Sequence, residues 1–414
     1  MPSSPSPAAA GVPADAAPPR RVLPVIVFAQ LLGTSPWFAV NAVMPDLQAA
    51  HAHQGWPVAA VATLSSALQI GFIVGTLVFA LLAVADRFPA RRVFLACSLA
   101  CGIATLAAAA MASSYAALVA WRVLTGFFLA GIYPVGMKIA SQWFPRGLGA
   151  ALGWLIGALV LGSASAHALR ALVSGGAALP WQWVFVAVAL LCVAAGLAVV
   201  LLVPEPTPAA ASRSAAVRGL RIGALASLWR DRRVRASAFG YFGHMWELYT
   251  VWVLMPAIIA TRLADSVAVS WWTFAALGAG ALGCVLGGQL VARWGSARVA
   301  AVQLAVSGLC CLVAPWLMPA ALGLFLAWLV LWGITVVGDS PQFSALTAAN
   351  APREAVGSVL TLTNSLGFAI SALSIEVFVR LAASVPLAQV LPWLAIGPAL
   401  GLLALRPLLT RNPT

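Results

Sequence analysis

The stretch Leu82–Leu95 reads L-A-V-A-D-R-F-P-A-R-R-V-F-L and separates two long apolar runs. Four charges stand where one hydrophobic segment ends and the next begins: Asp86, Arg87, Arg91 and Arg92. The gap is too short for a domain and too charged for lipid, because a charged side chain inside a bilayer costs a few kcal/mol or more. The stretch therefore predicts a tight loop between two membrane-spanning helices.

The composition places the rest of the chain in a membrane as well. Of its 414 residues, 62% are hydrophobic and 8% charged, with a mean hydropathy of +0.99, whereas an ordinary soluble domain carries about 25% charge. Apolar runs of about 20 residues recur, and each can cross the hydrocarbon as a helix. We expect an all-α polytopic membrane protein, because a helix satisfies its own backbone hydrogen bonds in lipid.

The net charge of +13 is explained by topology and needs no nucleic acid. On the expected topology 19 of the 23 basic residues lie in or beside segments on one membrane face, three (Arg170, Arg262 and Arg380) lie near the other face, and Arg122 lies within a helix. Positively charged loops stay in the cytoplasm. We therefore expect a multi-pass protein of the cell (inner) membrane with both termini cytoplasmic.

Twelve spans can be placed along the chain. Residues 1–19 are expected to form a disordered cytoplasmic tail, because they offer too little to bury. A first bundle, 20–203, holds a retained first span followed by spans near 58–84, 93–112, 115–142, 148–172 and 181–203. The proline- and arginine-rich segment 204–235 is the expected cytoplasmic linker. A second bundle, 236–410, holds spans near 236–262, 269–292, 300–318, 321–346, 356–382 and 387–407.

Within the linker, basic and apolar residues alternate between Arg218 and Arg230. Such a segment can form a short helix attracted to anionic lipid. A plain solvated linker is equally compatible with the pattern.

The two halves repeat each other. Three registers agree within a few residues, at offsets of 206, 207 and 211. The second copy of the charged loop has Ala292 where the first has Asp86. The repeated pairs are Arg87 and Arg293, Arg92 and Arg298, Pro134 and Pro341, and Met44 and Met255.

The charged loop resembles the signature loop of the major facilitator superfamily, which usually reads G-x-L-x-D-R-x-G-R-R. The charges match, whereas Leu82 and Pro89 replace the two glycines. With the number and order of spans, the resemblance covers about residues 20–410. It implies 12 transmembrane helices in two six-helix bundles, with a substrate site between them near mid-membrane.

The resemblance also implies a conformational latch. In the family the loop aspartate faces a helix N-terminus and the arginines reach across the cytoplasmic side, which favours the outward-open state. A carboxylate at the positive end of a helix is stabilised by up to about 1 kcal/mol. The alternative is that these charges only fix the topology. The latch residues on this reading are Asp86, Arg87, Arg91, Arg92, Arg293 and Arg298.

The seventh span carries Tyr241, His244 and Glu247 at intervals of three, on roughly one helix face. By resemblance this span faces the central cavity. Glu247 lies about 16 Å deep, at 1.5 Å per residue from the inner end. Burial disfavours the charged form of an acid and a neighbouring base favours it, so Glu247 is our candidate for proton coupling. The alternative is a permanent structural pair with Arg122 or a hydrogen bond to His244.

Two further spans carry polar residues that need partners. Arg122 on the fourth span keeps its proton, so it requires a carboxylate, an anionic substrate or, in a purely structural role, backbone carbonyls. On the tenth span Pro341 breaks the helix and frees the carbonyl of residue 337 for a ligand, unless the kink only shapes the helix. We assign proton coupling to Asp339 with Glu247. The substrate-binding candidates are Arg122, His244, Tyr241, Gln342, Trp37 and Asn41.

No motif indicates an enzyme, a cofactor or a metal site. There is no nucleotide-binding loop, and the six cysteines all fall inside apolar segments. We therefore expect a monomeric secondary active transporter that moves a small organic anion or zwitterion by alternating access, with protons and the lipid bilayer as its other partners. Two alternatives stay open: a proton-antiport drug or multidrug exporter, and a non-transporting membrane receptor or scaffold.

Overall fold

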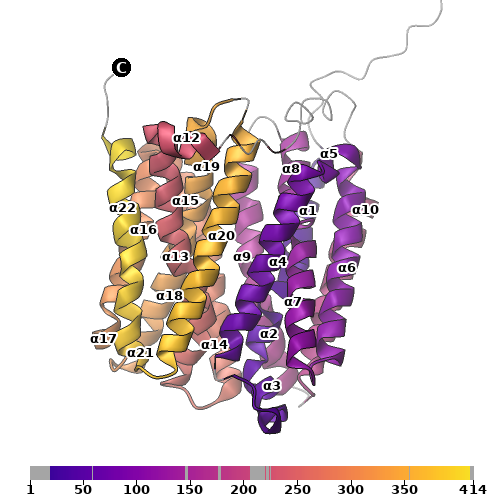
Figure 1. The fold of residues 1–414 in the computed structure, drawn as a ribbon, viewed down its shortest axis with the longest axis vertical. Helices are drawn as coiled ribbons and strands as arrows, with labels where there is room; N and C mark the ends of the chain where they lie inside the picture. Colours follow the sequence, from indigo (N-terminus) through magenta and orange to yellow (C-terminus); the bar gives the residue numbers. More distant parts are fainter. Residues whose placement is uncertain are drawn as a thin grey trace, which may run out of the picture.

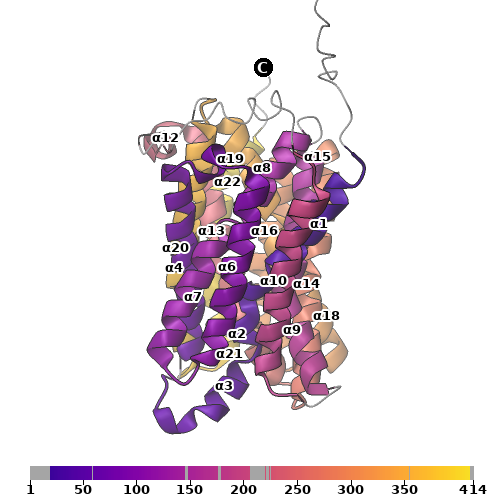
Figure 2. The same ribbon diagram turned by 90° about the vertical axis from the view of Figure 1, so that its right-hand side faces the viewer.

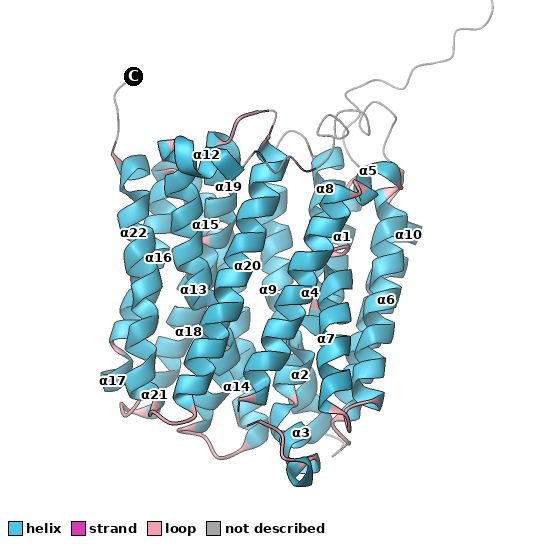
Figure 3. Cartoon of the chain, viewed as in Figure 1, coloured by secondary structure: helices cyan, strands magenta, loops and turns pink. Residues whose placement is uncertain are grey.

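The computed structural model describes residues 19–57, 59–144, 148–175, 179–205, 220, 223, 225–353 and 355–410. Within these ranges every regular element is a helix and no strand occurs (Figure 3). The predicted tail and most of the predicted linker lie outside the described residues. The all-α prediction is confirmed.

The first half contains six spans joined by short loops. Between them lie three short elements: α3 (Met44–Ala50), η2 (Ala52–Gln54) and α5 (Val84–Arg87). The spans are α1 (Val22–Gly33) continued by η1 (Ser35–Phe38) and α2 (Ala39–Ala42), α4 (Ala60–Leu81), α6 (Ala90–Ala110), α7 (Tyr115–Leu129) with α8 (Tyr133–Trp143), α9 (Leu148–Gly175) and α10 (Gln182–Leu202).

The second half repeats this plan after the short helix α12 (Leu225–Arg230), which is the described part of the amphipathic segment considered in the linker. Its spans are α13 (Arg232–Ala260), α14 (Ser266–Gly278) with α15 (Gly280–Trp294), α16 (Ser296–Leu312) with α17 (Ala314–Leu317), α18 (Leu322–Gly338) with α19 (Ser340–Asn350), α20 (Val356–Ala382), and α21 (Leu387–Val390) with η4 (Leu391–Ala395) and α22 (Ile396–Leu409).

Ten of these described segments are long and apolar enough to cross a membrane. The remaining two, α13 and the shorter α16, complete the 12 predicted transmembrane helices. Figure 1 shows the first-half helices, indigo to magenta, beside the second-half helices, orange to yellow. We call the side that carries α5, α12 and the end of α22 the terminal side. The opposite side, with α3, α17 and α21, is the far side (Figure 2).

Helix breaks occur at equivalent places in the two halves. The α7–α8 break precedes Pro134, and the α18–α19 break falls at Asp339, just before Pro341. A proline in the first turn of a helix loses no intrahelical hydrogen bond, so each proline starts a new segment. The predicted break at Pro341 is confirmed.

Glycines at the same offset let neighbouring helices touch through their backbones. A Cβ added at Gly126 would lie 1.9 Å from the carbonyl oxygen of Leu68, and one at Gly333 would lie 1.8 Å from that of Ala276. No side chain fits at either distance. The contacts α4–α7 and α14–α18 therefore depend on glycine, and the sequence repeat reflects a repeated packing solution.

We predict that Gly333→Ala destabilises the fold. The added methyl group would meet the Ala276 carbonyl, which cannot rotate away as a side chain can, and overpacking of this kind costs about 1–3 kcal/mol. Gly323→Ala in the same helix is the matched control, because nothing lies within 4 Å of its added Cβ. Thermal unfolding of both variants in detergent should show a lower midpoint for Gly333→Ala alone. Equal midpoints would contradict the packing argument.

We also predict that the terminal side faces the cytoplasm. Thr410 ends α22 on the terminal side and Ser384 follows α20 on the far side; both are exposed. In intact cells a membrane-impermeant maleimide should label Ser384→Cys but not Thr410→Cys. The described native cysteines are buried and give a low background. External labelling of Thr410→Cys would show the reverse orientation.

Candidate functional site

A cavity of about 700 Å³ lies between the two halves. Its walls come from α4, α8 and α9 of the first half and from α15, α19 and α20 of the second. It extends to the terminal side, because Asp86 in the charged loop and Ser296 in the equivalent loop of the second half both line it. This cavity is the place where a solute can lie between the halves.

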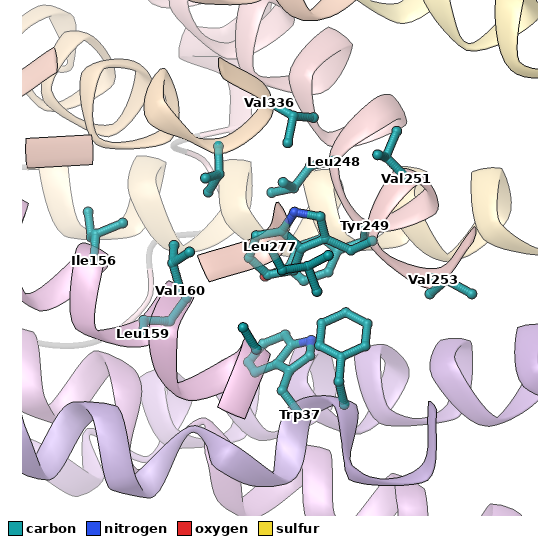
Figure 4. Close-up of a cluster of buried hydrophobic side chains, with 14 of the residues drawn as sticks. Trp37, Ile156, Leu159, Val160, Leu248, Tyr249, Val251, Val253, Leu277 and Val336 are labelled. Atoms are coloured by element: carbon teal, nitrogen blue, oxygen red, sulfur yellow. The ribbon is translucent and has the colours of Figure 1, made fainter. Parts of the chain in front are cut away.

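Toward the far side the two halves meet, and α4 contacts α20 through Ser66, Gln69 and Thr63. Trp37 stacks on Tyr249 with ring centroids 5.6 Å apart, and Phe72 lies 4.7 Å from Phe368. Figure 4 shows Trp37 of the first half opposite Tyr249 of the second. Gln69 Nε2 also donates to Ser371 Oγ at 3.2 Å. Aromatic contacts and hydrogen bonds thus join the halves away from the cavity.

Trp37 and Asn41, both predicted to bind substrate, lie in this closed region. Trp37 is buried within the aromatic contact, and Asn41 Nδ2 donates to Ser65 Oγ at 2.8 Å. Neither lines the cavity in this conformation.

Arg122 is held by backbone carbonyls. Its Nη2 donates to the Trp37 carbonyl at 2.8 Å, its Nη1 to that of Pro36 at 3.1 Å and its Nε to that of Leu64 at 3.4 Å. The first two carbonyls belong to η1, where the first span leaves regular α-helical geometry. The considered pair of Arg122 with Glu247 does not form, because the guanidinium faces carbonyls of the first half and Glu247 faces donors of the second. These contacts favour the purely structural role over the predicted substrate contact, and the Arg122→Lys variant below distinguishes the two.

Glu247 is buried in the second half among three donors. Trp332 Nε1 donates to Oε1 at 2.7 Å, the Cys311 thiol donates to Oε1 at 3.2 Å, and Ser307 Oγ lies 2.9 Å from Oε2. No described Arg, Lys or His forms an ion pair with it. The considered hydrogen bond to His244 is likewise absent, so the acid is solvated by neutral groups.

His244 instead faces Asp339. Its Nδ1 lies 2.8 Å from Oδ1 of Asp339, and both side chains are buried. Neither Asp339 oxygen nor His244 Nε2 has a well-directed hydrogen bond to a described residue. The ring of Tyr241 lies 5.7 Å from that of His244. Tyr241 and His244, which were predicted to bind substrate, and Asp339, which was predicted to bind a proton, therefore form one cluster.

Tyr241, His244 and Glu247 spread over about 120° of the α13 surface. All three still contact the broken tenth span, at Phe343, Asp339 and Trp332 in turn. A step of three residues turns an α-helix by about 300°, so two steps fall about 120° short of two full turns. Tyr241 faces Phe343 of α19, whereas Glu247 faces α16 and α18. The helix rotation separates the two acids into different environments.

The α18–α19 break connects this cluster to the cavity. Asp339 stands at the break, and Pro341 and Gln342 directly after it line the cavity. The Val337 carbonyl, which was predicted to be available for a ligand, accepts from the Cys284 thiol at 3.6 Å. Of the tenth-span candidates, Gln342 is the one that lines the solute space.

The charges of the signature loop pair within the first half. Asp86 pairs with Lys138 of α8, and Arg91 pairs with Glu205. No ion pair joins Arg87, Arg92, Arg293 or Arg298 to a described residue. The cavity separates the two loops here, so the latch across the halves stays a prediction for another conformation.

Sequence reasoning missed four residues of the site: Lys138, Ser307, Cys311 and Trp332. The last three lie in apolar spans, and nothing local marks them as partners of an acid. Lys138 did carry a signal, since it is the single lysine among 23 basic residues.

No described group of three or more His, Cys, Asp or Glu side chains could hold a metal ion. Two six-helix halves around a cavity that extends to one side define a membrane transporter. The family model of the Major Facilitator Superfamily matches residues 26–375. The chain belongs to this superfamily, as the signature loop indicated, and it is not an enzyme.

A solved structure supports the fold. The crystal structure of the human organic anion transporter MFSD10 (TETRAN) matches with a TM-score of 0.71 at 17% identity, covering 93% of this chain and 99% of that one. No curated protein matches the sequence.

We predict that Arg122→Lys lowers stability and leaves solute affinity of the folded protein intact. A lysine ammonium cannot reproduce the fork that contacts three carbonyls, and each lost charged hydrogen bond is worth about 1.5–3 kcal/mol. Arg380→Lys, at an exposed position, is the control. Thermal unfolding and uptake kinetics should be measured together. Normal stability with a large rise in KM would instead support direct substrate binding.

Proposed function

We propose that this transporter is a proton-coupled secondary carrier that moves a small organic solute, an anion or zwitterion in preference to others, by alternating access. The observation that carries the proposal is the cavity, which extends to the terminal side while Trp37, Phe72, Tyr249 and Phe368 close the far side. A carrier must hold its solute at a site that opens to one side at a time. The receptor or scaffold alternative is set aside, because the chain is a transporter.

Proton coupling is supported by the surroundings of Glu247. When the acid is ionised, the Ser307 hydroxyl donates to Oε2. When it is protonated, Oε2 donates to Ser307, whose hydroxyl then donates to the Leu304 carbonyl 3.1 Å away. The same positions of the heavy atoms thus satisfy both forms. A buried acid without a cationic partner, in a site that tolerates either form, suits a group that gains and loses a proton.

The His244–Asp339 pair offers a route from the proton site to the solute. Both groups are buried and incompletely hydrogen-bonded, a condition that costs about 1–3 kcal/mol for each unsatisfied group. A new partner for His244 or Asp339 would therefore recover part of this cost when the cavity rearranges. Because Asp339 stands at the helix break, such a change would move Pro341 and Gln342 in the cavity wall.

The preference for an anion rests on the cavity lining. Lys138, which pairs with Asp86, is the cationic side chain among the lining residues, and the second half contributes the neutral polar groups Gln342, Asn364 and Ser358 to the lining. MFSD10, which shares the fold, is named as an organic anion transporter. These observations favour a solute with at least one negative group.

A proton-antiport drug exporter is the second candidate. The same walls carry large apolar side chains, among them Phe79, Met137 and Ile156, which suit an amphipathic molecule. Flux into proteoliposomes under an imposed pH gradient, measured for matched anions and cationic drugs, separates the two candidates.

We predict that Glu247→Gln abolishes uphill transport driven by pH and retains solute exchange. The amide mimics the protonated acid, so the carrier can still reorient but cannot move a proton in each cycle. Gradient-driven uptake and exchange between matched compartments should be measured in proteoliposomes. Glu376→Gln is the control, because Glu376 pairs with Arg380 near the far side, outside the cavity lining.

Two results would contradict this role for Glu247. Undiminished pH-driven uptake by Glu247→Gln would eliminate it. Loss of uptake, exchange and protein yield together would indicate a structural acid.

A further inference from the structure

Lys138 is an exception in this chain. It is the single lysine, while the other 22 basic residues are arginine. It lies on α8, and its side chain keeps 17% exposure where it lines the cavity. Its ammonium group donates both to the Ala85 carbonyl and to the carboxylate of Asp86. The only lysine therefore joins the solute space to the signature loop.

The repeat shows that the fold does not require this ion pair. At the offsets of 206 and 207, Asp86 corresponds to Ala292 and Lys138 to Ala345. The second half forms the same broken helix with neither charge, although its loop, within the described residues, has no helix equivalent to α5. Ala345 lines the opposite wall of the same cavity. One copy carries both charges and the other carries neither, so the broken helix itself forms without the pair.

A lysine side chain suits an ion pair in which one carboxylate is exchanged for another. An ammonium group is a compact charge with three donors, so it can keep the Ala85 carbonyl while it replaces one carboxylate with another. The pair is partly exposed, at 17% for Lys138 and 31% for Asp86. Pairs of this kind are weak in water, so an incoming carboxylate can compete. An arginine held in a bidentate fork would exchange less readily.

The opposite wall holds the partner that a released Asp86 would meet. Val291 and Ser296 line the cavity on either side of the second-half loop, which carries Arg293. Neither Arg293 nor Arg298 pairs with a described residue. Two arginines that form no ion pair with the described residues thus lie in or just after the second-half loop, whose flanking residues Val291 and Ser296 line the cavity wall opposite Asp86.

We propose that Lys138 is the anion-binding group of the cavity, and that a bound organic carboxylate displaces Asp86 and frees it to attract Arg293 or Arg298 as the terminal side closes. This inference rests on the proposed function and names the group that recognises the anion. It makes the anion the trigger for the predicted latch. The charge on Lys138 stays balanced, because one carboxylate replaces another, and the released Asp86 is balanced by an arginine of the second half.

Because Lys138 is the single lysine, the rate at which its amine is modified can be measured without mutating any other side chain. The full-length protein in phosphatidylcholine proteoliposomes would be treated with formaldehyde and cyanoborohydride, which methylate accessible amines. Mass spectrometry then gives the modification rate of the Lys138 peptide, with the α-amine of the chain as internal reference. Lys138→Arg supplies the background.

The probes are acetate, benzoate and 2-naphthoate, each paired with its neutral amide. We expect the carboxylates to slow methylation of Lys138 and the amides to leave it unchanged. In Asp86→Asn the competing carboxylate is gone, so Lys138 should be methylated faster without ligand. The carboxylate concentration that halves the methylation rate should fall by about threefold, as expected for a weak competing pair. Glu205→Gln, which removes the carboxylate that pairs with Arg91, should leave that concentration unchanged.

Three outcomes would overturn the inference: no protection by any carboxylate, equal protection by acid and amide, or weaker protection in Asp86→Asn. A fourth arm adds anionic phosphatidylglycerol without probe; protection by this lipid alone would assign Lys138 to a headgroup and not to a solute. The proposed function is tested separately, by measuring solute uptake driven by a pH gradient. Uptake without protection of Lys138 defeats only this inference, and protection without uptake defeats only the proposed carrier activity.

Discussion

A polar group inside a membrane span must find its partner within the protein, because the surrounding lipid offers none. This constraint explains how the buried charges of the chain are arranged. Arg122 is satisfied by three carbonyls near the irregular turn of the first span. Glu247 is satisfied by an indole, a hydroxyl and a thiol. The sites differ in one respect: an arginine keeps its proton in any surroundings, whereas an acid among neutral donors can exist in two forms.

The two halves share one helix arrangement but carry different charged residues. Glycines in equivalent positions give both halves the same close helix contacts, and prolines in equivalent positions give both a broken helix. At the same break the first half has Ile132 where the second has Asp339. The buried acids therefore gather in the second half, while the Lys138–Asp86 pair belongs to the first. A carrier built in this way can separate a proton site from a solute site and connect them through helix movement.

The conformation described here has its contacts between halves on the far side and its cavity toward the terminal side. Aromatic side chains form the closed region, and the contact of Trp37 with Tyr249 joins the first span directly to the seventh. The Arg122 side chain of the fourth span donates to backbone carbonyls of the first span and so holds the two spans together. Residues that were expected to touch solute, Trp37 and Asn41, thus belong to the closed region in this conformation. Their contact with solute would require the far side to open.

The number of spans, the charged loop, the internal repeat and the break at Pro341 could all be predicted from the sequence alone. Hydropathy, charge and the missing proline N–H act locally, so they can be recognised without knowing which helices are neighbours. The tertiary structure decided the partners. Glu247 meets Trp332 and not Arg122, because α13 packs against α18 while the Arg122 side chain is held by carbonyls of the first half. His244 meets Asp339 instead. The pairing of Lys138 with Asp86 likewise joins residues 52 positions apart, and only the packing of α8 against the loop brings them together.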